Sequence, residues 1–282
     1  MILSAASSET AGRVLIAASV VAALAYLAAA VASNKAADKA TDTARPRLLL
    51  MLLAAWIAQA VALTVDIAGI GLPVPGARFG FAPALSATMW LVLAVYMVES
   101  RLLPLASARR VLAVLGLLAV LLALIFPGES RPLAVSPWAP LHWVLGLASY
   151  GLFGVAVLHA VLLNRAERQM RNKLSSVSAM PGLPLLRLER LTFQFVAAGV
   201  VVLSLAILLG WWFTPHWRWD HKNLLAVLGW IVLSGLLAGR RAFGWRGRLA
   251  TRWLYFGAVL LLLSYAGSRS VLEVILQRPI PS

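Results

Sequence analysis

Long uninterrupted apolar runs dominate the pattern of this sequence. A helix that crosses the hydrocarbon core of a bilayer needs about 20 predominantly apolar residues. Eight runs reach or approach that length, at residues 14–32, 48–68, 81–98, 106–126, 141–163, 193–213, 224–238 and 253–276. The seventh run is the shortest. The pattern therefore predicts about eight transmembrane segments.

The runs are continuous, which decides between helices and strands. Lipid offers no hydrogen bonds to the backbone, so only helices and closed barrels span a membrane. Barrel strands alternate apolar and polar residues over about ten positions, and no such alternation is present here. With 61% hydrophobic and only 12% charged residues, a soluble fold is not expected. We predict an all-α integral membrane protein.

Basic residues are concentrated in every second connection between the runs. Cytoplasmic loops carry an excess of Lys and Arg, so we expect these connections in the cytoplasm and both termini outside. The first run is interpreted as a retained helix, because most nearby cations follow it. The net charge is +15. Because the cations lie between apolar runs and not in a separate basic domain, we expect no nucleic-acid partner. The cations concerned are Lys35, Lys39, Arg45, Arg47, Arg101, Arg109, Arg110, Arg165, Arg168, Arg171, Lys173, Arg187, Arg190, Arg240, Arg241, Arg246, Arg248 and Arg252.

The chemical repertoire is narrow. The chain has no cysteine, which excludes disulfides, zinc–thiolate sites and thiol chemistry of its own. Nucleotide-binding, metalloprotease and nucleophile-elbow motifs are also absent. We therefore expect no enzyme, and redox chemistry would need a cofactor or a partner.

The connection between the sixth and seventh runs, residues 210–223, differs from the others. Within thirteen residues it holds four tryptophans, two histidines, an aspartate and two cations. An aromatic belt at the membrane surface explains Trp211 and Trp212. The remaining cluster suits haem, because imidazole ligates iron, indoles cover apolar faces and cations pair with propionates. Chemistry alone leaves both interpretations open for His216, Trp217, Arg218, Trp219, Asp220, His221 and Lys222.

Two further histidines lie in the fifth run. His142 is at its outer end and shares a helix face with Gly146, Ser149 and Phe153. That face is suited to close approach of a helix or a ring. His159 lies near the inner end and is expected to face the interior of the bundle. Either histidine could be a ligand. The alternative for His142 is a histidine at the membrane interface, and the alternative for His159 is a core histidine hydrogen-bonded to a neighbouring helix.

A family resemblance emerges from these residues. Trp217-Arg218-Trp219-Asp220-His221-Lys222 resembles the tryptophan-rich signature of the cytochrome c assembly (CcsA/CcmC-type) haem-handling family, close to Trp-x-Trp-Asp-Pro-Lys-Glu. The turn Gly244-Trp245-Arg246-Gly247 and the segment Tyr265-Ala266-Gly267 are similar too, so the resemblance covers residues 141–276. Leu188-Glu189 and Phe193 resemble the YpjD/HemX-like inner-membrane branch. The chain departs from the pattern at His221, Asn223 and Ala238, where the family has Pro, Glu and, in full-length synthases, a second intramembrane histidine.

The resemblance implies a function. Residues 1–140 would form an N-terminal four-helix membrane region, and residues 141–282 a cytochrome c assembly-like region. His142 and His221 would ligate haem iron at the outer face, with His216 as a substitute and His159 as an intramembrane counterpart. The expected role is a haem chaperone in the bacterial cytoplasmic (inner) membrane that serves an apocytochrome c, alone or with other cytochrome assembly subunits. A HemX-like regulator or scaffold of haem biosynthesis is the alternative, and a small-solute transporter ranks third.

Overall fold

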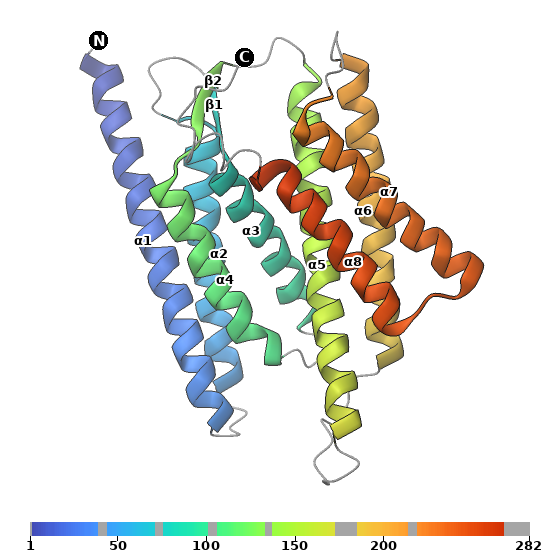
Figure 1. Cartoon of the computed structure of the whole chain (residues 1–282). Coiled ribbons are helices and arrows are strands. Elements are labelled where there is room, and N and C mark those ends of the chain that lie inside the picture. Colours follow the sequence, from blue (N-terminus) through green and yellow to red (C-terminus); the bar gives the residue numbers. More distant parts are fainter. Residues whose placement is uncertain are drawn as a thin grey trace. The chain divides into compact units, whose positions relative to one another are not determined.

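The computed structural model of the chain describes residues 2–38, 44–70, 76–100, 106–132, 137–172, 185–213 and 219–267. It consists almost entirely of helices (Figure 1). The chain divides into two compact units, Met1–Val135 and Ser136–Ser282. We refer to them as the N-terminal and the C-terminal unit and describe each by itself.

The N-terminal unit contains four helices and a short ribbon of two strands. The helices α1 and α2 pack against each other, α1 also packs on α4, and α3 contacts both α2 and α4. The strands pair antiparallel, with Gly76 opposite Pro132 and Phe79 opposite Glu129. The elements are α1 (Ile2–Asp38), α2 (Ala44–Ile67), β1 (Gly76–Phe79), α3 (Phe81–Glu99), α4 (Ala106–Ile125) and β2 (Glu129–Pro132).

The ribbon was not predicted from the sequence. Its two strands have four residues each and lie about fifty positions apart in the chain. Such short segments show no alternating pattern of their own, and their pairing depends on how the helices between them fold back. The ribbon also brings Arg78 within 3.6 Å of Asp66. Asp66 is buried.

The C-terminal unit consists of two helical pairs. The helices α5 (Ala139–Asn172) and α6 (Leu185–Phe213) pack along most of their length. The helices α7 (His221–Phe243) and α8 (Gly247–Leu262) form a second hairpin, which runs obliquely to the first pair (Figure 1). The helix α8 continues directly into a π-helical turn, η2 (Leu263–Gly267).

The prediction of eight helices is confirmed. Among the described residues, seven helices are long and apolar enough to cross a membrane, and α8 with η2 is the eighth. The seventh run looked too short, but α7 has 23 residues. Its ends are polar, so the apolar run is shorter than the helix. Asp220 caps the start of α7: its carboxylate accepts a hydrogen bond from the backbone N–H of Asn223 at 2.8 Å. Gly244, at φ +66°, ends it in the left-handed conformation that favours glycine.

The helix α6 begins before the apolar run that predicted it. Residues 185–191, which alternate Leu with charged residues, form its first turns. Leu188 is buried, and Glu189 forms an ion pair with Arg240 of α7. The Arg240 guanidinium neutralises the Glu189 carboxylate, so this charged residue is accommodated within the helix.

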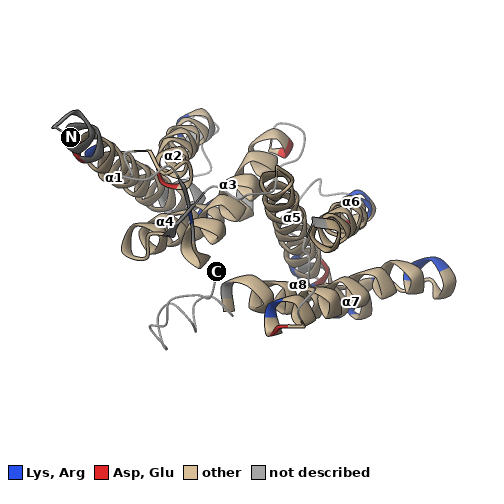
Figure 2. Cartoon of the chain, turned by 90° about the horizontal axis from the view of Figure 1, so that it is seen from above, with Lys and Arg blue, Asp and Glu red and all other residues tan. Residues whose placement is uncertain are grey.

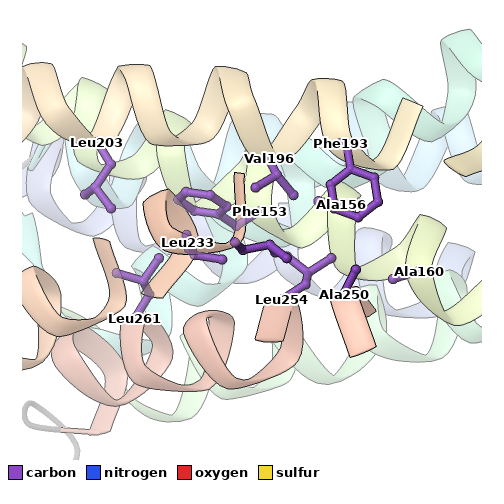
Figure 3. Close-up of a cluster of buried hydrophobic side chains, with 11 residues drawn as sticks. Phe153, Ala156, Ala160, Phe193, Val196, Leu203, Leu233, Ala250, Leu254 and Leu261 are labelled. Atoms are coloured by element: carbon purple, nitrogen blue, oxygen red, sulfur yellow. The ribbon is translucent and has the colours of Figure 1, made fainter. Parts of the chain in front are cut away.

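The C-terminal unit is held by a cluster of buried apolar side chains (Figure 3) and by close approach of its helices at small residues. A Cβ atom at Gly199 of α6 would lie 2.7 Å from the Phe153 ring of α5, and one at Gly257 of α8 would lie 2.6 Å from Leu233 of α7. Such distances are too short for a real Cβ atom. Both helical pairs therefore approach at glycines. The buried cluster around them consists of Phe153, Ala156, Ala160, Phe193, Val196, Leu203, Leu233, Leu236, Ala250, Leu254 and Leu261.

The N-terminal unit has a buried polar centre instead. Gln59 of α2 accepts a hydrogen bond from the Tyr26 hydroxyl of α1 at 2.5 Å. It donates to the carbonyl and the hydroxyl oxygens of Ser86 of α3, at 3.0 and 2.9 Å. Gly116 of α4 leaves room for the Tyr26 ring, to which a Cβ atom would come within 2.8 Å. One hydrogen-bond network thus joins α1, α2 and α3, and α4 packs on its Tyr26 ring.

The surfaces of both units fit a lipid environment. Exposed large hydrophobic side chains occur along nearly every helix, such as Leu24, Leu50, Leu118, Leu208 and Ile231. Lys, Arg, Asp and Glu lie mainly at helix ends (Figure 2). An apolar outside between polar ends is the arrangement expected of membrane-spanning helices.

Candidate functional site

His142 is held by the backbone of the neighbouring helix. It lies in the first turn of α5, and its Nδ1 atom is 2.8 Å from the Ala206 carbonyl oxygen of α6. A carbonyl oxygen can only accept a hydrogen bond, so Nδ1 carries the proton. In the neutral ring this leaves the lone pair on Nε2. Histidines that ligate metals commonly have this arrangement, with the other ring nitrogen donating to a carbonyl or carboxylate oxygen.

Gly210 makes room for the His142 ring. A Cβ atom at this position would lie 2.9 Å from Cε1 and 3.1 Å from Nδ1 of His142. Gly210 follows Ala206 by one helical turn, so the ring rests on the turn whose carbonyl it contacts. Sequence reasoning missed this role, because Gly210 reads only as the first residue of the Trp-rich connection.

Two other elements, α7 and η2, contribute side chains to the same end of the C-terminal unit. Lys222 lies in the first turn of α7. The Lys222 Nζ atom lies 5.8 Å from the centre of the Tyr265 ring of η2, and Tyr265 in turn lies 6.3 Å from the ring of Tyr150 of α5. The Ser264 hydroxyl donates to the Lys222 carbonyl oxygen at 2.8 Å. We call this group, with His142 and Gly210, the histidine end.

The predicted residues of the Trp-rich connection are only partly described. His216, Trp217 and Arg218 lie outside the described residues. Asp220 caps α7 and has a structural role there. His221 is the first residue of that helix and is exposed, and Trp219 is 69% exposed. The structure places the start of α7 at the histidine end, while the pairing of His142 with His221 stays a prediction.

His159 belongs to a different part of the unit. Its ring is fully buried and lies 5.4 Å from the Phe195 ring of α6, edge to face. It follows His142 by seventeen positions (159 minus 142) along one helix, a rise of about 25 Å. The two imidazoles therefore do not share a site, and the expected position of His159 in the bundle interior is confirmed.

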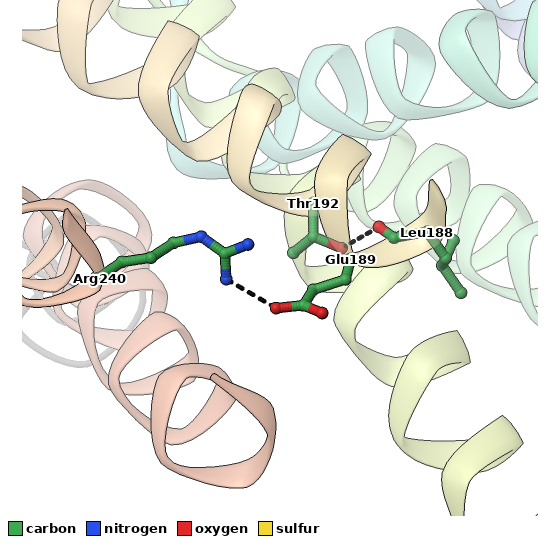
Figure 4. A network of polar contacts seen from close by, with 4 residues as sticks. All are labelled: Leu188, Glu189, Thr192 and Arg240. Atoms are coloured by element: carbon green, nitrogen blue, oxygen red, sulfur yellow. Dashed lines mark hydrogen bonds and ion pairs between the residues drawn. The ribbon is translucent and has the colours of Figure 1, made fainter. Parts of the chain in front are cut away.

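An ion pair joins α6 and α7 at the end of the C-terminal unit opposite to the histidine end. The Arg240 Nη1 atom is 2.8 Å from the Glu189 carboxylate (Figure 4). Its guanidinium carbon lies 3.8 Å from the centre of the Phe193 ring. Next to it, the Thr192 hydroxyl donates to the Leu188 carbonyl oxygen at 2.8 Å. The sequence singled out Glu189 and Phe193, but their common partner Arg240 becomes apparent only in the fold.

The histidine end offers the imidazole of His142 as a possible ligand. Within the described ranges, no three His, Cys, Asp or Glu side chains converge on a possible metal position. A haem brings its own in-plane nitrogen ligands, so it needs only axial ligands from the protein. The imidazole of His142, fixed through Nδ1, is of the required type.

Fold and site together define a multi-pass helical membrane protein with a candidate cofactor site at one end of its C-terminal unit. Residues 7–276 match the family described as cytochrome c assembly protein. The chain belongs to this family, which confirms the resemblance inferred from the Trp-rich segment.

Individual relatives agree with this assignment. The chain is 35% identical over 166 residues to inner membrane protein YpjD of Escherichia coli K12, covering 57% of this chain and 62% of YpjD. It is 26% identical over 172 residues to cytochrome c biogenesis protein CcsA of Synechococcus sp. WH7803, covering 48% and 53%. It is 29% identical over 123 residues to CcsA of Gloeothece citriformis, covering 42% of this chain and 35% of that protein.

The chain thus matches about one third to two thirds of the length of these relatives. No solved structure matches it. The name of YpjD and the apolar helices place the chain in the cytoplasmic (inner) membrane as a multi-pass protein.

Proposed function

We propose that this protein acts in cytochrome c biogenesis by holding haem at the histidine end, with Nε2 of His142 as an axial ligand. The observation that carries the proposal is the hydrogen bond from His142 Nδ1 to the Ala206 carbonyl oxygen, at a position cleared by Gly210. Membership in the cytochrome c assembly family supports it independently.

Residues of the Trp-rich connection have complementary roles in this proposal. His221 is the proposed second axial ligand, with His216 as a substitute. Trp217 and Trp219 would cover the apolar faces of the ring, and Arg218 and Lys222 would pair with the propionates. By capping α7, Asp220 fixes the start of the helix that carries His221 and Lys222.

The protein would act as a chaperone and not as an enzyme. A bound haem would supply the iron that the imidazole nitrogens ligate and the ring edge that an apocytochrome would receive. Thioether attachment requires cysteine thiols, and this chain has none. Its own residues bind the group, orient it and balance its charge.

The proposal is tested by adding haemin to the purified protein and recording visible spectra and dissociation constants. Wild type should give a low-spin spectrum, and both His142→Ala and His221→Ala should lose it. His159→Asn is the matched control that should keep it, and His216→Ala should have a smaller effect than His221→Ala. Unchanged spectra and affinity in both His142→Ala and His221→Ala would refute the ligand assignment. A wild type that binds no haem would favour a HemX-like regulator or scaffold.

We further infer that both termini and the histidine end face the outer side of the membrane. Support comes from the basic connections, which alternate with poorly charged ones as cytoplasmic loops do. An alkaline phosphatase fused after Ser282 should be active, and one fused at Ser176 should be inactive. The reverse pattern would place the histidine end in the cytoplasm and contradict delivery at the outer face.

A further inference from the structure

The tip of the α7–α8 hairpin carries a concentrated positive charge. No acidic residue occurs between Asp220 and Glu273. Arg240 is neutralised by Glu189 of α6, but four further arginines around the turn are exposed. In the part of the chain that the structure describes, none of these four forms an ion pair. We call residues 241–253 the hairpin tip; its arginines are Arg241, Arg246, Arg248 and Arg252.

The tip has a fixed shape. Gly244 and Gly247 adopt φ values of +66° and +58°, which L side chains rarely do. Between them, the Trp245 ring packs on Gly239, where a Cβ atom would come within 2.6 Å. Trp245 also stacks on Trp253, with 6.3 Å between ring centres and planes 13° apart. The backbone angles and the packing of Trp245 therefore fix the positions from which the arginine side chains extend.

An apolar stripe runs beside the arginines on α8. Arg248 and Arg252 are one turn apart, and Leu249, Trp253 and Phe256 follow a neighbouring line at the same spacing. All five are exposed. The stripe leads from the charged tip into the apolar length of the helix. The boundary between polar headgroups and hydrocarbon is where such a combination of cations and aromatic rings is stable.

We propose that the hairpin tip binds the headgroups of anionic phospholipids. Guanidinium groups would pair with lipid phosphates, while Trp253 and the exposed ring of Phe243 lie at headgroup depth. The N-terminus of α8 reinforces this: the side chain of its N-cap residue, Arg246, does not cap the helix, and the first turn has no acidic residue. Figure 2 shows basic residues at the end of α7, where the tip begins.

An acidic protein is a weaker candidate for the occupant. It would cover the arginines, but the stripe of Leu249, Trp253 and Phe256 continues along the apolar length of α8. A phospholipid matches both features at once, with its phosphate at the arginines and its acyl chains along the stripe. The continuity of charge and apolar surface therefore favours lipid.

The experiment compares lipid selectivity of full-length variants. Protein is reconstituted in bilayers of equal phosphatidylglycerol and phosphatidylcholine, released, and analysed for retained lipid by native mass spectrometry. Wild type should retain phosphatidylglycerol preferentially, and Arg246→Gln with Arg248→Gln should reduce this preference at least about tenfold. Arg165→Gln with Arg168→Gln removes the same charge from the exposed end of α5 and should leave the preference intact.

The outcomes separate the alternatives. Retained preference in the Arg246/Arg248 glutamine variant, or an equal loss in the Arg165/Arg168 variant, would overturn the proposal. So would equal retention of both lipids by wild type. A variant with Lys at positions 246 and 248 keeps the charge and should keep the preference, which excludes misfolding as the cause of a loss.

Discussion

The N-terminal and C-terminal units use their buried polar groups in different ways. In the N-terminal unit, polar side chains satisfy one another: Tyr26, Gln59 and Ser86 form one network across three helices. Trp56 and Trp90 stack at 4.6 Å, and each indole N–H donates to the other residue's carbonyl oxygen. In the C-terminal unit, His142 is instead oriented by a backbone carbonyl of the next helix.

The difference separates a stabilising role from a binding role. A polar network whose members satisfy each other fixes the relative rotation of helices. A histidine that donates Nδ1–H to a carbonyl has a fixed ring plane and keeps the Nε2 lone pair for a further interaction. The first arrangement suits a scaffold, and the second suits a site that holds a ligand.

The largest effect is expected for Gln59→Leu in the N-terminal unit. Leucine has a similar volume, but the substitution removes the three hydrogen bonds of the Gln59 side chain. The buried Tyr26 hydroxyl then loses its acceptor. The free energy of unfolding should fall by roughly 2–3 kcal/mol. Thermal or detergent-induced unfolding of the purified protein measures this loss.

The same variant tests the division of roles. Gln59→Leu protein that remains folded should bind haemin as wild type does. A changed haem spectrum at conditions where the protein is folded would show that the two units are coupled, which contradicts the comparison.

A smaller effect, confined to ligand binding, is expected for Gly210→Ala. The new Cβ atom would meet the His142 ring at 2.9 Å and displace it from the Ala206 carbonyl. Disturbing a group that orients a metal ligand typically lowers affinity by about 10–100-fold. Haemin titration measures the change, and it should be accompanied by a shifted spectrum.

Gly199→Ala is the matched control. It creates a similar clash in the same helical pair, because its Cβ atom would lie 2.7 Å from the Phe153 ring. This variant should lose about 1–3 kcal/mol of stability and keep its haem spectrum. Equal effects of the two substitutions on haemin binding would indicate general loosening of α5 and α6, with no special role for Gly210.

The candidate site was only partly predictable. The sequence identified His142 and Lys222 as candidates from their residue types and their places at the ends of apolar runs. Gly210 and the carbonyl of Ala206 carried no such signal, because glycine and alanine are common in membrane helices and a backbone oxygen has no sequence signature. Arg240 was counted only as a loop cation, since its partner Glu189 lies 51 positions away.

The sequence by itself determined the class of the protein and its helices. Apolar length, the lack of alternation and the alternation of charge between connections are local properties, and they predict spanning helices without any knowledge of their neighbours. The turn at Gly244 and Gly247 is local too, because only glycine readily adopts its backbone angles. The same holds for Asp220, which caps its own helix.

Tertiary structure alone decided how the helices face one another. The contact between His142 and Ala206 joins residues 64 positions apart, and that between Tyr26 and Gln59 joins residues 33 apart. Each depends on the rotation of two helices about their axes. In nearly uniform apolar helices, hydropathy specifies that rotation poorly. It is set by the fit of rings onto glycines and by the need of buried polar groups for partners.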